Sequence, residues 1–157
     1  MEALCIALNI RNSAPSQYLG YNFNSLCEFN DQILGAGDGG IFQLDTGSLD
    51  DTTPIEAYVE WVSDLGIPYP KHVRRLTVGC KATGELLVTT SADGGPEYVE
   101  PLLVDPTDKY GVWLIKGRRT CRGRYLTIRI GNVDGAYFSI DQVTADVTPV
   151  NIRAGLQ

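Results

Sequence analysis

The chain has 157 residues, of which 43% are hydrophobic and 20% charged, and its formal net charge is −6. This composition is typical of a folded globular chain, and the length suits one domain with its own core. The acidic balance argues against a general nucleic-acid binder, which would carry a basic surplus. No apolar run approaches the roughly 20 residues of a membrane-spanning helix. Met1–Ile10 lacks the basic start and cleavage site of a signal peptide, so we expect folding in a cytoplasm.

In the first part of the chain, the β-rich runs 21–29, 32–34 and 41–44 predict a small meander with turns at Asn30–Asp31 and Asp38–Gly39. The segment Gly35–Gly40 matches the pattern G-x-G-x-x-G. A dinucleotide site needs a helix after that pattern, and a β run follows here instead. We therefore expect a glycine-rich hairpin turn and no nucleotide cofactor. The meander, within residues 1–45, is too small to bury a core alone and is expected to be an annex.

The rest of the chain alternates apolar and polar residues with a period of two, and no segment has the helical period. The expected strands lie within 55–61, 75–80, 86–90, 98–104, 112–116, 125–130 and 137–147. The last run changes parity, which predicts a bulge near Asp141–Gln142. Short strands separated by turns predict an all-β fold, an antiparallel β-sandwich of jelly-roll-like type over residues 54–148. We expect one domain, 1–157, comprising annex and sandwich.

The residues that most often carry chemistry are few. The cysteines are far apart and form no C-x-x-C pair, so we expect four free thiols that act as small core residues: Cys5, Cys27, Cys80 and Cys121. The single histidine, His72, follows a proline-rich segment and is expected in an exposed loop. Neither a zinc site nor a nucleophile–histidine site is indicated. The pair Asp50–Asp51 lacks the oxygen-rich pattern of a calcium site and is expected in a solvated acidic loop.

Several aromatic residues fall at expected strand positions, namely Tyr58, Trp61, Tyr98, Trp113 and Tyr125. Aromatic residues on strands are most often core residues or cross-strand pairs. The alternative is a platform on the sandwich that stacks against sugar rings.

Positive charge is concentrated in one segment. From Lys109 to Val133 there is no Asp or Glu, and seven of the 13 basic residues lie there. Its densest part contains Lys116, Arg118, Arg119, Arg122 and Arg124. Three interpretations stay open: a solvated loop, a contact with an acidic surface such as Asp50–Asp51 of a neighbouring subunit, or nucleic acid. Arginine suits bidentate pairing with carboxylates, so the subunit contact is the functional hypothesis.

Several segments, taken together, also resemble those of a known class of proteins. They are 22–29 leading into 35–44, then 64–68, 71–76, 123–126, 132–135 and 138–141. Together they resemble small structural proteins of tailed bacteriophages and prophages, of the tail, baseplate or neck class. The likeness spans about residues 18 to 148. It implies a virion component built around a β-sandwich and present in several copies.

The expected function is therefore structural, as a tail or baseplate subunit that is assembled in the host cytoplasm and resides in the virion. Its expected partners are other copies of itself and other virion proteins, without nucleic acid, membrane, metal or cofactor. The alternative is a carbohydrate-binding β-sandwich module for recognition of a host surface. An enzyme such as a cell-wall hydrolase is the third hypothesis, and it would need two carboxylates roughly 5–9 Å apart.

Overall fold

The computed structural model of the chain describes residues 4–11, 13, 15–44, 47–50, 52–105 and 109–150. Over these residues it contains strands and no helix, which confirms the all-β class. None of these residues therefore belongs to a helix long and apolar enough to cross a membrane. The chain divides between Gly47 and Ser48 into two compact units, and each is considered by itself below. The sequence prediction placed the end of the annex at residue 45 and the start of the sandwich at residue 54.

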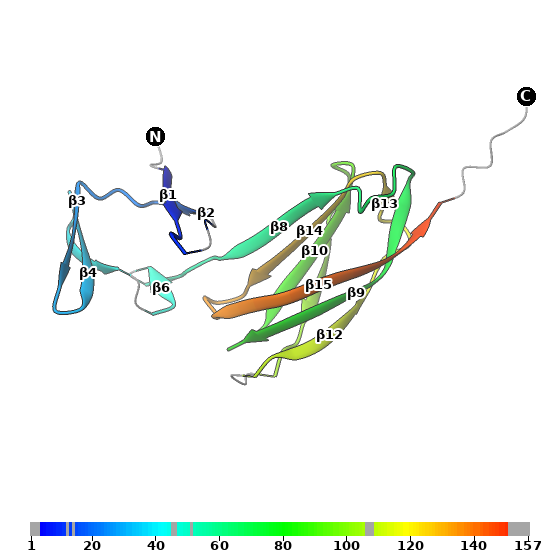
Figure 1. Cartoon of the computed structure of the whole chain (residues 1–157). Coiled ribbons are helices and arrows are strands. Elements are labelled where there is room, and N and C mark those ends of the chain that lie inside the picture. Colours follow the sequence, from blue (N-terminus) through cyan, green and yellow to red (C-terminus); the bar gives the residue numbers. More distant parts are fainter. Residues whose placement is uncertain are drawn as a thin grey trace, which may run out of the picture. The chain divides into compact units, whose positions relative to one another are not determined.

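Unit 1 contains two small antiparallel sheets. Its strands are β1 (Leu4–Leu8), β2 (Pro15–Leu19), β3 (Ser25–Phe29), β4 (Gln32–Gly37) and β5 (Gly40–Leu44). The first sheet pairs β1 with β2, and the second has the order β3-β4-β5 (Figure 1). The predicted meander is confirmed, although β3 begins at Ser25 and not at residue 21.

The turns of the meander follow from residue type. Asn30 and Asp31 connect β3 to β4 with φ angles of 50° and 59°, values that asparagine and aspartate tolerate better than most residues. Gly35 lies under the ring of Phe23, because an added Cβ there would be 2.7 Å from Phe23 Cγ. The segment Gly35–Gly40 therefore runs from strand to turn to strand, as the sequence predicted, and no helix follows it.

Unit 1 has almost no interior. Among its described residues only Gly35 is buried, and most of its apolar strand residues are exposed. Short two- and three-stranded sheets cannot cover both of their own faces. Within the unit, an aromatic series packs ring to ring, with successive centroid distances of 5.5, 4.8 and 5.9 Å between Tyr18, Tyr21, Phe23 and Phe42.

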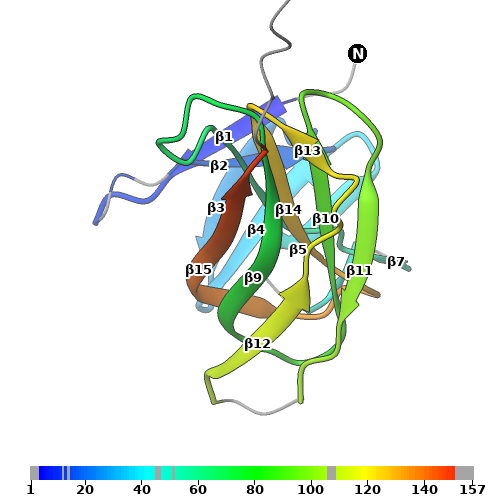
Figure 2. The ribbon, with the colours of Figure 1, turned by 90° about the vertical axis from the view of Figure 1, so that its right-hand side faces the viewer.

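Unit 2 is a two-layer antiparallel sandwich. A short ladder of β6 (Leu49–Asp50) and β7 (Thr53–Pro54) precedes it. One sheet has the order β11-β10-β14-β8, formed by Tyr98–Leu102, Leu86–Ala92, Leu126–Asn132 and Tyr58–Ser63. In the other, β9 (Lys71–Ala82) lies between β15 (Phe138–Pro149) on one side and β12 (Gly111–Lys116) with β13 (Arg122–Gly123) on the other. Figure 1 shows β15, β9 and β12 side by side, and Figure 2 shows β11 beside β10.

The core lies between these two sheets and comes from alternate residues of the central strands. Leu76, Val78 and Cys80 point inward from β9, and Leu126, Ile128 and Ile130 point inward from β14. Leu86 and Val88 of β10 complete the centre. Burying apolar surface at about 25 cal/mol per Å² makes this cluster the main source of the sandwich's stability.

The start of β8 differs from its prediction. The alternation predicted a strand over 55–61, whereas β8 runs from Tyr58 to Ser63. Ile55 and Ala57 are not part of this strand, because the side chain of Asn132 forms hydrogen bonds with their backbone. The Asn132 Oδ1 atom accepts from Ala57 N at 2.8 Å, and its Nδ2 donates to Ile55 O at 2.9 Å. A side-chain amide from β14 thus replaces a strand partner over these residues.

Two register shifts bend the pairing of β15 with β9. The first lies between Ile140 and Gln142, which confirms the predicted bulge and lets Ile140 and Val143 both pack on the core. The second lies between Asp146 and Val147, which pair with Arg75 and Val73 and leave Arg74 as the extra residue of β9. The sequence prediction missed this second bulge. The sequence does contain a signal for it, because two polar residues, Arg74 and Arg75, separate the inward-pointing Val73 and Leu76, where strict alternation would place only one.

The lysine that begins β9 is fully buried. Lys71 is 0% exposed, and its Nζ donates to the carbonyl of Ile67 at 2.8 Å and to the carbonyl of Arg124. These bonds join the loop before β9 to the loop between β13 and β14. A buried ammonium group is tolerated because neighbouring carbonyl oxygens accept hydrogen bonds from it.

We expect Lys71→Met to destabilise the sandwich by about 2 kcal/mol, because two buried carbonyls lose their donor while the volume is nearly conserved. Chemical denaturation of the purified protein measures this change. The matched control is Lys116→Met, which alters an exposed lysine and should leave the midpoint nearly unchanged. Equal midpoints for Lys71→Met and the wild type would contradict the structural role of this ammonium group.

Candidate functional site

The basic segment leaves β12, passes through a loop and returns to β9 as β13. Lys116 ends β12 and pairs with Arg75, while Arg122 pairs with His72. Between them the chain is held close to β9 by Gly117, whose N–H donates to Arg74 O at 3.0 Å. Any side chain at this position would meet the backbone of Val73, so glycine is required for the close approach.

Asp93 holds the far end of the segment. Its carboxylate accepts from the backbone N–H of Tyr125 at 2.8 Å and from that of Arg124 at 2.9 Å. These two backbone hydrogen bonds, from Tyr125 and then Arg124, lower the pKa of Asp93, and the charges of Lys71 and Arg124 add to the effect. Asp93 and the buried Lys71 therefore fix the loop from both sides.

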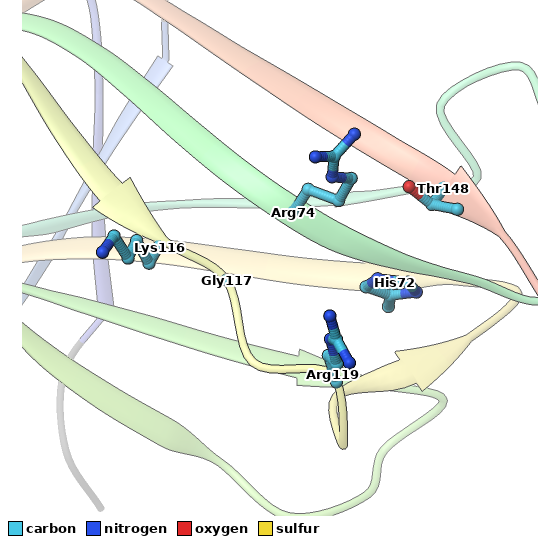
Figure 3. Close-up of a pocket in the computed structure, with 6 residues that line it drawn as sticks. All are labelled: His72, Arg74, Lys116, Gly117, Arg119 and Thr148. Carbon is cyan, nitrogen blue, oxygen red and sulfur yellow. The ribbon is translucent and has the colours of Figure 1, made fainter.

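A cavity of about 570 Å³ opens on the outer face of the β9 sheet beside this loop. Its lining residues are His72, Arg74, Lys116, Gly117, Arg119 and Thr148 (Figure 3). In Figure 3, Arg119 reaches toward His72, while Arg74 and Lys116 extend to different sides. No Asp or Glu lies in the lining, so the cavity is a site of positive potential.

The structure brings only part of the sequence-predicted basic set to this cavity. Lys116 and Arg119 line it. Arg118 is engaged elsewhere, since its Nε lies 2.7 Å from Glu100 Oε1 and its guanidinium carbon lies 5.9 Å from the ring centroid of Tyr98.

The two remaining basic residues lie along the path to β14. Arg124 stacks on Tyr125, with 5.2 Å between the guanidinium carbon and the ring centroid. Arg122 is exposed on β13. Arg74, His72 and Thr148 were absent from the predicted set, because adjacent strands bring them to the cavity from distant positions in the sequence.

The acidic half of the predicted interface lies apart from these cations in the sequence. Asp50 is exposed on the short strand β6. Asp51 lies outside the described residues. Among the described residues, no group of three or more His, Cys, Asp or Glu side chains is placed to hold a metal ion.

The predicted position of His72 was wrong. It was expected in an exposed loop, but it lies within β9 and is half-buried. The strand extends back to Lys71 because Arg122–Gly123 and Thr148–Pro149 pair with it on both sides. Such long-range pairing partners leave no signal in the local sequence.

The cysteines are free, as predicted, but not all lie in a core. Cys80 and Cys121 are buried in the sandwich, and burial raises the pKa of both thiols. Cys5 is half-buried and Cys27 is exposed, so the expectation of four core residues was wrong for unit 1. The reason is that unit 1 has almost no interior in which to place them.

The five aromatic residues do not form one platform. Trp61 and Trp113 pair with the inward-pointing Ile128 and Val78, and Trp113 and Tyr98 pack against the core. Tyr58 lies on the outer face of the other sheet with Arg129 3.7 Å from its ring centroid. It borders a groove of about 420 Å³ whose lining also includes Glu56, Leu87, Thr89, Arg129 and Asp134.

No protein-family model matches the chain, and no curated protein matches it at a significant level.

We expect Asp93→Asn to lower the melting temperature at about pH 7 by a few degrees, because the amide loses the charge-assisted bonds to two backbone N–H groups. The folded-state pKa of Asp93 is lowered, so its stabilising contribution is present above the unfolded-state pKa of about 3.9 and is lost as the pH falls through the lowered value. The difference between variant and wild type should therefore shrink at about pH 2.5.

Thermal melts of Asp93→Asn and of Asp134→Asn measure this effect. Asp134 is a second exposed turn aspartate, with a φ of 51° like that of Asp93. Its substitution should change the melting temperature little at either pH. A pH-independent difference for Asp93→Asn would contradict the electrostatic origin.

Proposed function

We propose that the protein is a structural subunit of a bacteriophage tail or baseplate, which assembles with copies of itself and with other virion proteins. The main support for this proposal is the exposed apolar surface of unit 1. Ile6 of β1 is 69% exposed and Ile41 of β5 is 76% exposed. Other apolar residues of unit 1 with more than half of their surface exposed are Leu4, Leu8, Ile10, Leu19, Leu26 and Phe29. Exposed apolar residues in this number favour a protein–protein interaction site.

The strand edges of unit 1 support the same proposal. Each of its sheets has two outer strands, and among the described residues these have a pairing partner on one side only. Such edges present backbone N–H and C=O groups to a partner strand. Apolar side chains together with open edges suit addition of a strand from another subunit.

The distribution of charge supports a contact in which unit 1 of one copy meets the β9 sheet of the next copy. In the sequence of unit 1, five acidic residues accompany the single basic residue Arg11. The sandwich carries the exposed cations Arg75, Lys116 and Arg122 on one sheet. A head-to-tail contact between an acidic, apolar unit and a basic sheet generates rings or tubes when repeated.

We expect the purified protein to form an oligomer in which Cys27 of β3 is protected from a thiol reagent. Dilution should dissociate it and expose Cys27, which is accessible in the single chain. Light scattering coupled to gel filtration measures the mass, and labelling followed by mass spectrometry measures the protection.

The variant Ile6→Glu with Ile41→Glu should shift the protein to monomer, because it places charge on the proposed contact. The matched control is Val62→Glu, at a residue on β8, outside the basic sheet, that is 64% exposed. A wild-type protein that stays monomeric at high concentration, with Cys27 fully reactive, would refute the assembly proposal.

The groove beside Tyr58 favours a second function, glycan binding. Tyr58 is exposed on β8. The neighbouring residue on β14 is Gly131, which has no side chain to cover the groove, and a Cβ at this position would lie 3.3 Å from Tyr58 Cβ. Glu56, Thr89 and Asp134 supply hydrogen-bonding groups around an aromatic ring. A glycan array tests this function: binding lost in Tyr58→Ala and kept in Tyr125→Ala supports it, and an array without signal rejects it.

A further inference from the structure

The cavity beside β9 gathers cations that the chain itself does not neutralise. Arg74, Lys116 and Arg119 line it together with His72. Among the described residues, none of these four side chains has an ion pair or a side-chain hydrogen bond. Gathering like charges around one hollow raises their mutual repulsion, which an anion in the hollow would relieve.

The nearby carboxylates do not serve this purpose. Glu100 is paired with Arg118, at 2.5 Å from its Nη2. Asp93 accepts two backbone N–H groups of the loop. Asp146 pairs in register with Arg75, which does not line the cavity. The positive charge of the cavity is thus left for a ligand from outside.

The positions of the lining groups are set by the fold. Arg74 is the extra residue of the second bulge, and bulges re-aim side chains at sites of this kind. Thr148 pairs with His72 across β15 and β9, so both side chains lie on the same outer face. The hydrogen bond from Gly117 to Arg74 O brings the loop that carries Arg119 against the bulge.

We propose that this cavity binds an oxyanion of the phosphate class. A tetrahedral anion offers several acceptor oxygens, which suit the guanidinium group of Arg119 beside His72, and the unpaired charges of Arg74 and Lys116 at the rim add to the attraction. The hollow is open to solvent, which suits a small, strongly charged ion held by cations and not an apolar ligand that needs enclosure. The proposal shares Lys116 with the basic sheet of the assembly proposal, but its test variant changes Arg74 and Arg119, which that contact does not use.

The test is a titration with inorganic phosphate at constant ionic strength, followed by amide chemical shifts. We expect saturable shifts at Gly117, Arg119 and Thr148, with sodium chloride giving none. The variant Arg74→Gln with Arg119→Gln should weaken binding by at least about ten-fold, because the charge-assisted hydrogen bonding of Arg119 and the charge of Arg74 are both lost.

The matched control is Arg75→Gln with Arg129→Gln, which removes the same charge from positions outside the cavity. It should change the affinity by no more than about two-fold if binding is local. An equal loss in both double variants, or the absence of saturable shifts in the wild type, would overturn the proposal in favour of diffuse attraction by a basic surface.

A second titration with a short single-stranded oligonucleotide identifies the source of the phosphate group. Tighter binding than inorganic phosphate, lost in Arg74→Gln with Arg119→Gln and kept in the control, assigns the site to a polymer phosphate. Binding of inorganic phosphate alone assigns it to the free ion. Oligonucleotide binding that is unaffected by the cavity variant, without a phosphate response, would refute the site.

Discussion

The buried ammonium group of Lys71 is the contact on which one end of the sandwich depends. It joins the carbonyls of Ile67, in the loop before β9, and Arg124, in the loop between β13 and β14. Asp93 lies close enough for its carboxylate to be stabilised by that charge, and it binds the backbone of the same basic loop. One positive and one negative group thus fix a segment that has little apolar packing of its own apart from Cys121. The exposed arginines of the loop can therefore be held in defined places without a core beneath them.

Strand β9 carries both the stability and the candidate site. Its inward residues, Leu76, Val78 and Cys80, lie at the centre of the core. Near its start the bulge at Arg74 interrupts the alternation, and the outward side there becomes basic. A rigid strand that is paired on both sides limits the movement of the cations it presents. This arrangement is the one expected of a binding site built on regular structure.

The two units obey the same hydrophobic constraint in different ways. The sandwich encloses its apolar residues between two sheets. Unit 1 has the strands and turns of a stable β structure but too few layers to enclose Leu26, Ile33 or Phe42. These exposed apolar residues are the basis of the proposed assembly with other subunits. The acidic character of unit 1 and the basic face of the sandwich are the reason for proposing another copy as the partner.

The sequence by itself determined the all-β class, the glycine-rich hairpin, the free cysteines and the bulge near Asp141, because period-two alternation and turn chemistry are local signals. It also located the concentration of positive charge between Lys109 and Val133. The tertiary structure alone decided which cations share a cavity. Arg74, Arg119 and Thr148 come from the bulge of β9, the loop after β12 and the end of β15, and only strand pairing brings them together. It likewise decided that Arg118 pairs with Glu100 and that Lys71 is buried, since both depend on partners contributed by distant segments.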